Sequence, residues 1–110
     1  MSELSLQVGD VIQLRDSGNS NADRSRPPSL HLVLKVREGK PSTFIIVPKP
    51  EYAWSLQIDP SIHPNCGLSE IHIILPVTPT AINPDWIEKV VGNVPLKLVE
   101  DSIAEYKLNI

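Results

Sequence analysis

The sequence predicts a single, mainly β domain: a small antiparallel barrel followed by C-terminal helices. Its length of 110 residues suits one hydrophobic core. Short apolar and β-branched runs, separated by Gly, Pro and Asn, fill most of the chain. Helix-start signals and apolar residues at helical spacing appear only towards the C-terminal end. We therefore expect one domain over residues 1–110, with strands first and helices last.

The first strand is expected at residues 11–14, directly after the Gly9-Asp10 turn signal. From Arg15 to Ser29 the composition becomes Asp, Ser, Asn, Gly, Arg and Pro, which favours a long polar loop. Loops of this length in compact domains are often functional, so the segment is a candidate site.

The clearest strand covers residues 30–36, where side chains alternate between two faces. One face is expected to carry Leu30, Leu32, Leu34 and Val36, and the other His31, Val33 and Lys35. A turn at 37–41 and a β-branched strand at 43–47 would complete a hairpin. Pro48 and Pro50 bound it, because proline supplies no amide to a sheet.

A further strand is expected at residues 52–58, and a loop at 59–67. Residues 70–75 alternate again and predict a final strand that extends towards Thr80. Asn83, Pro84 and Asp85 are an N-cap, a first-turn proline and an early acid, so a short helix should begin there and end at Gly92.

A second helix is expected from Pro95 onwards, with one apolar face for packing. That face should carry Leu96, Val99, Ile103 and Tyr106, with Lys97, Glu100, Asp101 and Glu105 left polar. Five or so short strands followed by two helices fit a small SH3-like antiparallel barrel.

Charge and composition narrow the class of protein. The net charge is −3, but residues 1–50 sum to +2 and residues 51–110 to −5, which permits an RNA-binding face in the first half. No apolar run is long enough to span a membrane, and the N-terminus lacks a secretory pattern. With Cys66 as the single cysteine, we expect a cytoplasmic protein with no disulfide, no metal site and no cofactor.

Several features occur in an order that resembles the MazF/PemK family of toxin endoribonucleases. They are the Gly9-Asp10 turn, the polar loop, Arg26-Pro27 before a hydrophobic strand, a strand ending in Val47-Pro48, and the helical tail. The resemblance runs from about Val8 to Leu108. It implies a MazF/PemK/CcdB-type barrel that forms a homodimer and belongs to a toxin–antitoxin pair. It further implies a sequence-specific hydrolase that cleaves single-stranded RNA without metal, by attack of the ribose 2′-hydroxyl, until a cognate antitoxin binds.

The resemblance also assigns residues. Arg26 matches the catalytic arginine of the family, whose planar guanidinium grips phosphate oxygens. The family normally has a threonine or serine where this chain has Pro50, so cleavage is expected to be impaired, with Lys49 supplying charge instead. His31 is a candidate proton carrier. Arg15, Arg24 and Lys49 are the expected RNA-binding cations.

Simpler interpretations stand beside these. Arg26, Lys49 and His31 are also compatible with ordinary surface positions. Tyr52 and Trp54 are candidates for stacking on bases, although packing in the core or a dimer is the favoured role of Trp54 and Trp86. The alternative function is a non-catalytic SH3-like module that binds RNA or a peptide partner. A third interpretation is an interaction domain that docks through its tail helix.

Overall fold

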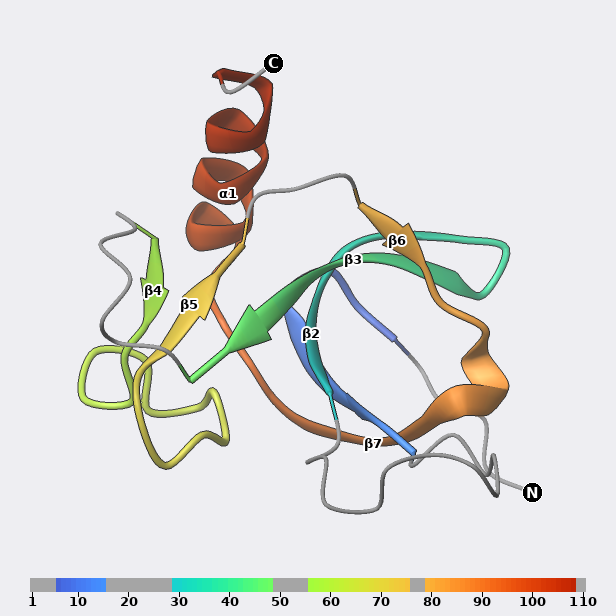
Figure 1. Ribbon diagram of the computed structural model, residues 1–110, viewed down its shortest axis with the longest axis horizontal. Coiled ribbons are helices and arrows are strands. Elements are labelled where there is room, and N and C mark those ends of the chain that lie inside the picture. Colours follow the sequence, from blue (N-terminus) through green and yellow to red (C-terminus); the bar gives the residue numbers. More distant parts are fainter. Residues whose placement is uncertain (1–5, 16–28, 49–55, 76–78, 109–110) are drawn as a thin grey trace.

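The computed structural model describes residues 6–15, 29–48, 56–75 and 79–108 (Figure 1). These residues form seven strands, one 3-10 helix (η1) and one α-helix. The elements in chain order are β1 (Asp10–Leu14), β2 (Leu30–Arg37), β3 (Lys40–Val47), β4 (Gln57–Ile58), β5 (His72–Ile74), β6 (Thr80–Ala81), η1 (Pro84–Trp86), β7 (Ile87–Asn93) and α1 (Leu96–Leu108). The predicted mainly β architecture with a helix at the C-terminal end is confirmed.

All strands belong to one antiparallel sheet with the order β4-β5-β3-β2-β1-β7, and β6 pairs separately with β3. The sheet curls strongly, so that β6 and η1 bridge the space between β3 and β7, while α1 stands on the side of β5 (Figure 1). The result is a small, barrel-like, half-open sheet.

The β2–β3 hairpin is confirmed, and its turn is tight. Glu38 and Gly39 have φ values of 54° and 77°, as in the two-residue turns whose twist matches that of a hairpin. Pairing begins at Arg37 with Lys40 and proceeds regularly to Lys35 with Ser42, after which Val33 pairs with Thr43. Leu34 is therefore an extra residue, a β-bulge in β2.

The bulge changes which side chains share a face. Val36 was expected beside Leu30, Leu32 and Leu34, but it packs with Val33 on the opposite side of the sheet. Because side chains alternate with a period of two residues, one extra residue reverses the alternation beyond it. The assignment of Val36 was therefore wrong.

The two faces of the sheet carry two hydrophobic clusters. The larger one includes Leu32, Phe44 and Ile74 and is covered by α1, where the rings of Phe44 and Tyr106 lie 5.8 Å apart. The smaller one lies on the other face, towards β6 and η1, and consists of Ile12, Val33, Ile82 and Ile87. Burial of both clusters stabilises the folded sheet.

The predicted helix from Asn83 to Gly92 was wrong beyond its first turn. Asn83 does cap a helical turn, because its Oδ1 accepts a hydrogen bond from the amide of Asp85 at 3.0 Å. The turn stops at Trp86, and β7 follows directly. Residues 87–93 contain β-branched Ile and Val, and pairing with β1 buries Ile87 to 2% exposure, which outweighs the local helix signal.

The C-terminal helix is confirmed, with one change to its packing face. Val99 is buried, and Ile103 and Tyr106 pack against the larger cluster as expected. Leu96 is instead 57% exposed, and Leu98 packs in its place. Leu96 is the first residue of α1.

The remaining strand predictions are met in part. Of the strand expected at residues 52–58, the structure describes β4, while Tyr52 and Trp54 lie outside the described residues. The strand expected at 70–75 is present as β5. It does not extend to Thr80, because β5 ends at Ile74 and β6 is a separate strand that pairs with the opposite end of β3.

The curled sheet meets the loop of residues 59–71 along β7. The amide of Asn93 donates to the carbonyl of Asn65 at 2.9 Å. A Cβ on Gly67 would overlap the carbonyl oxygen of Val91, and a Cβ on Gly92 would overlap the backbone of Cys66. Only glycines allow these backbones to approach so closely, and this contact joins the β4–β5 end of the sheet to β7.

Candidate functional site

Three adjacent strands end together on one side of the molecule. Leu14 at the end of β1 pairs with Ile87 at the start of β7, and its amide donates to the carbonyl of Ser29, just before β2, at 3.0 Å. The amide of Arg15 then donates to the carbonyl of Trp86 at 2.7 Å. The topology therefore places Ser29, Arg15 and Trp86 side by side. Arg15 directly precedes the segment 16–28 in the sequence, and Ser29 directly follows it.

His31 lies just inside this end of the sheet and has a polar partner on each ring nitrogen. Its Nδ1 is 3.0 Å from Oγ1 of Thr43, and its Nε2 is 3.2 Å from Oγ of Ser29. The Thr43 hydroxyl in turn donates to the carbonyl of Thr80 at 3.4 Å. His31 is only 7% exposed and Thr43 is fully buried, whereas Ser29 is half-buried.

The hydrogen bonds around the ring favour one tautomer of His31. With its single proton directed at the carbonyl of Thr80, the Thr43 hydroxyl accepts from an Nδ1–H of His31. Nε2 is then the acceptor in the neutral ring and receives the hydroxyl proton of Ser29. Burial lowers the pKa of His31 below its ordinary value of 6.5, which also favours the neutral form. The site thus holds a neutral imidazole whose basic nitrogen faces Ser29.

The fold of the hairpin explains why Thr43 reaches His31. Between the bulge and the start of β2, His31 pairs with Ile45 and Val33 pairs with Thr43, so His31 and Thr43 are diagonal neighbours on one face. Without the extra residue at Leu34, the register of the turn would place Thr43 on the opposite face from His31. The bulge is therefore part of the site.

The predicted site residues are only partly placed by the structure. Arg15 is exposed at the end of β1, on the same side of the molecule as His31. His31 is buried and hydrogen-bonded, so the simpler interpretation of it as a surface residue was wrong. Arg24, Arg26 and Lys49 lie outside the described residues, as does Pro50. Arg26 is three positions before Ser29 in the sequence, and Lys49 follows directly after Pro48 at the end of β3.

Sequence reasoning missed three residues here. Ser29 shares a face with His31 because residues two apart in an extended chain point the same way, and this spacing was a usable signal. Thr43 was predicted only as a strand residue, since nothing in the sequence marks the bulge. Trp86 was expected in the core or a dimer contact, but in this chain it is 58% exposed, so core packing was wrong.

Other reactive side chains lie apart from this site. His72 is buried in β5, where its Nδ1 donates to the carbonyl of Glu70 at 2.9 Å, and Cys66 is a buried free thiol. Within residues 6–15, 29–48, 56–75 and 79–108, no three His, Cys, Asp or Glu side chains are placed to hold a metal ion. None of the helices in those ranges is long and apolar enough to cross a membrane.

A groove of about 310 Å³ lies on the opposite face of the β2–β3 hairpin. Its apolar lining comes from both the sheet and α1 and includes Leu34, Phe44, Ile103 and Tyr106. These side chains belong to or pack against the larger hydrophobic cluster, whereas His31 shares its face with Val33 of the smaller one. The groove is thus separate from the site around His31.

No protein-family model matches the chain, and no curated protein is similar to it in sequence.

Proposed function

We propose that this protein is a toxin-type endoribonuclease that resembles the MazF/PemK family, built on a small SH3-like barrel and acting on single-stranded RNA. One observation carries the proposal. A buried, neutral histidine is held by its Nδ1, so that its basic Nε2 faces the side of the molecule where the Arg-containing segment 16–28 begins and ends. Such a group suits proton transfer near neutral pH.

The proposed reaction needs no metal. The 2′-hydroxyl of the substrate ribose gives its proton to Oγ of Ser29, while the hydroxyl proton of Ser29 passes to Nε2 of His31. The ribose 2′-oxygen then bonds to the adjacent phosphorus and the bond from phosphorus to the 5′-oxygen breaks. The leaving 5′-oxygen takes a proton from a water molecule, and the hydroxide that remains takes back the proton held at His31 through Ser29, so the protein returns to its starting state. The other fragment then carries a 2′,3′-cyclic phosphate.

Arg26 is the residue proposed to stabilise the phosphate. Its guanidinium stays protonated and matches two phosphate oxygens at once, as a developing negative charge requires. Pro50 removes the hydroxyl and the amide that the family offers two residues after Pro48, and Lys49 contributes only a flexible charge. We therefore propose that this protein cleaves RNA more slowly than family members that have a threonine or serine at the position of Pro50.

The partners follow from the same resemblance. We propose a homodimer located in the cytoplasm and a cognate antitoxin protein that blocks cleavage. The excess of basic residues in the first half of the chain, including Arg15 and Arg24, supports contact with an RNA backbone.

Cleavage of a mixed-sequence RNA by the purified protein, in the presence of a chelator, tests this function. We expect fragments ending in cyclic phosphate, and at least about a hundredfold slower cleavage by Arg26→Ala and His31→Asn. Ser29→Ala is expected to slow it as well, without disturbing the buried ring. His63→Asn is the matched control, because His63 lies in the loop after β4. Folded wild-type protein that leaves every RNA intact would exclude the ribonuclease.

The second candidate is a non-catalytic module that binds RNA or a peptide partner. Pro50 favours it, because the site then lacks a hydroxyl that the family uses on phosphate. The two functions separate in one experiment. Retention of RNA by the protein without any cleavage, unaffected by His31→Asn, would support binding alone.

A further inference from the structure

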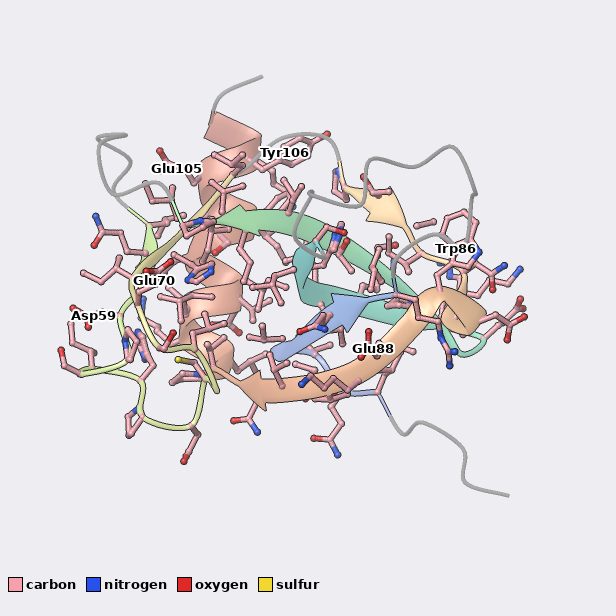
Figure 2. The ribbon with its side chains drawn as sticks, turned by 60° about the horizontal axis from the view of Figure 1, so that its bottom comes forward. Asp59, Glu70, Trp86, Glu88, Glu105 and Tyr106 are labelled. Atoms are coloured by element: carbon pink, nitrogen blue, oxygen red, sulfur yellow. The ribbon has the colours of Figure 1, made fainter. Side chains whose placement is uncertain are left out.

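In the described part of the chain, Trp86 is the one aromatic side chain among the large exposed hydrophobic residues. The described part of the chain exposes five large hydrophobic residues, namely Val8, Ile62, Trp86, Val90 and Leu96. Of these, Trp86 is the one at the strand ends next to Ser29 and Arg15. Figure 2 shows it on η1 at the start of β7, with Glu88 further along that strand.

The backbone of Trp86 is held on both sides. Its amide donates to the carbonyl of Asn83 at 2.9 Å, and its carbonyl accepts from Arg15 at 2.7 Å. The next residue, Ile87, is buried in the smaller cluster. A ligand that covers the indole therefore does not need to order the backbone that carries it. The indole can serve as a platform on this pre-organised backbone.

The position of the platform suits a strand of RNA that passes His31. Ser29 and Trp86 flank β1 on opposite sides, so their backbones lie about 10 Å apart, twice the spacing of neighbouring strands. A single strand of RNA that crosses this end of the sheet would pass the backbones of both Ser29 and Trp86. The backbone of Arg15 lies between them and bonds to that of Trp86, and the side chain of Arg15 is exposed to a phosphate of such a strand.

The charges around Trp86 decide which part of a nucleotide it binds. Asp85 and Glu88 are both exposed close to it in sequence, and they repel phosphate from the indole itself. A base has no charge and an aromatic face, and stacks on indole with little dependence on sequence. We propose that Trp86 is the base-stacking residue of a single-stranded RNA site, with Arg15 as its phosphate contact; this inference rests on the proposed function.

The experiment measures binding without cleavage. A fluorescein-labelled oligouridylate whose 2′-hydroxyls are all methylated cannot react, and its fluorescence anisotropy reports binding to the full chain. We expect Trp86→Ala to bind about tenfold more weakly and Trp86→Phe to retain most of the affinity. Leu96→Ala is the matched control, because Leu96 is equally exposed but lies at the start of α1.

An oligomer of the same length that lacks bases separates stacking from charge. Trp86→Ala should not weaken its binding, whereas Arg15→Gln should weaken both oligomers and reduce the salt dependence. Equal binding by wild type and Trp86→Ala, or an equal loss on both oligomers, would overturn the inference while leaving cleavage by wild type intact. A wild-type protein that binds neither oligomer would overturn the inference and count against RNA as the substrate.

Discussion

Nδ1 of His31 lies 3.0 Å from Oγ1 of Thr43, and the two residues share a face of the sheet because β2 contains one extra residue. The β-bulge at Leu34 thus determines which hydrogen-bond partner the His31 ring has. The contact favours the proton on Nδ1, and it leaves Nε2 as the basic atom at Ser29.

Replacing Thr43 by Val is expected to remove the hydrogen bond that favours the Nδ1–H tautomer of His31. Valine keeps the shape but offers no acceptor, so a buried N–H of His31 loses its partner, and the free energy of unfolding should fall by about 1–3 kcal/mol. Nitrogen chemical shifts of the ring, measured by NMR, should show a mixture of tautomers. Thr43→Ser retains the hydroxyl and is expected to behave like wild type. An unchanged tautomer in Thr43→Val would contradict the assignment.

The stability of the protein should depend on the protonation of His31. Its pKa is lowered by burial in the folded state, so above about pH 6.5 the ring is neutral whether the chain is folded or unfolded. As the pH falls below that value, the unfolded chain gains a proton that the folded chain resists. Stability is then lost until the pH passes the lowered pKa, with a slope below the one-proton limit of about 1.4 kcal/mol per pH unit.

Urea unfolding of wild type and His31→Gln at several pH values measures this dependence. The difference between the two proteins isolates His31 from the other histidines. We expect wild type to lose more stability than His31→Gln as the solution becomes acidic. Parallel curves for the two proteins would show that His31 keeps its ordinary pKa in the folded state.

Gly67 and Gly39 provide a matched pair for the contact along β7. Both have positive φ, 75° and 77°, so alanine is strained at either position by about 1–2 kcal/mol. A Cβ on Gly39 meets nothing within 4 Å, whereas one on Gly67 overlaps the backbone of Val91. Thermal or urea unfolding should therefore show Gly67→Ala to be less stable than Gly39→Ala by at least about 2 kcal/mol. Equal stabilities would mean that the close approach is absent in solution.

The sequence predicted most elements whose patterns are local. The hairpin of β2 and β3 and the helix α1 follow from alternation, turn residues and helical spacing, and all are present. Residues 87–93 were misassigned because a capped turn at Asn83 looks the same whether a helix or a strand comes next. Pairing with β1, a partner distant in sequence, decided the outcome.

The site was harder to predict than the fold. His31 was identified from its chemistry, but its burial depends on the sheet around it, and its contact with Thr43 depends on a bulge that leaves no mark in the sequence. Trp86 was predicted to pack because tryptophan usually does. In the structure it lies in η1, none of whose residues is buried.

The glycines at positions 67 and 92 have an effect beyond stability. An uncovered strand at the border of a sheet offers its amides and carbonyls to any other extended chain, and such pairing leads to aggregation. Here residues 65–67 lie against the C-terminal half of β7, and the amide of Asn93 is already bonded to Asn65. Bulkier residues at these glycines would separate residues 65–67 from β7 and expose β7 as an edge strand. The same substitutions that destabilise the fold are therefore expected to make the protein self-associate.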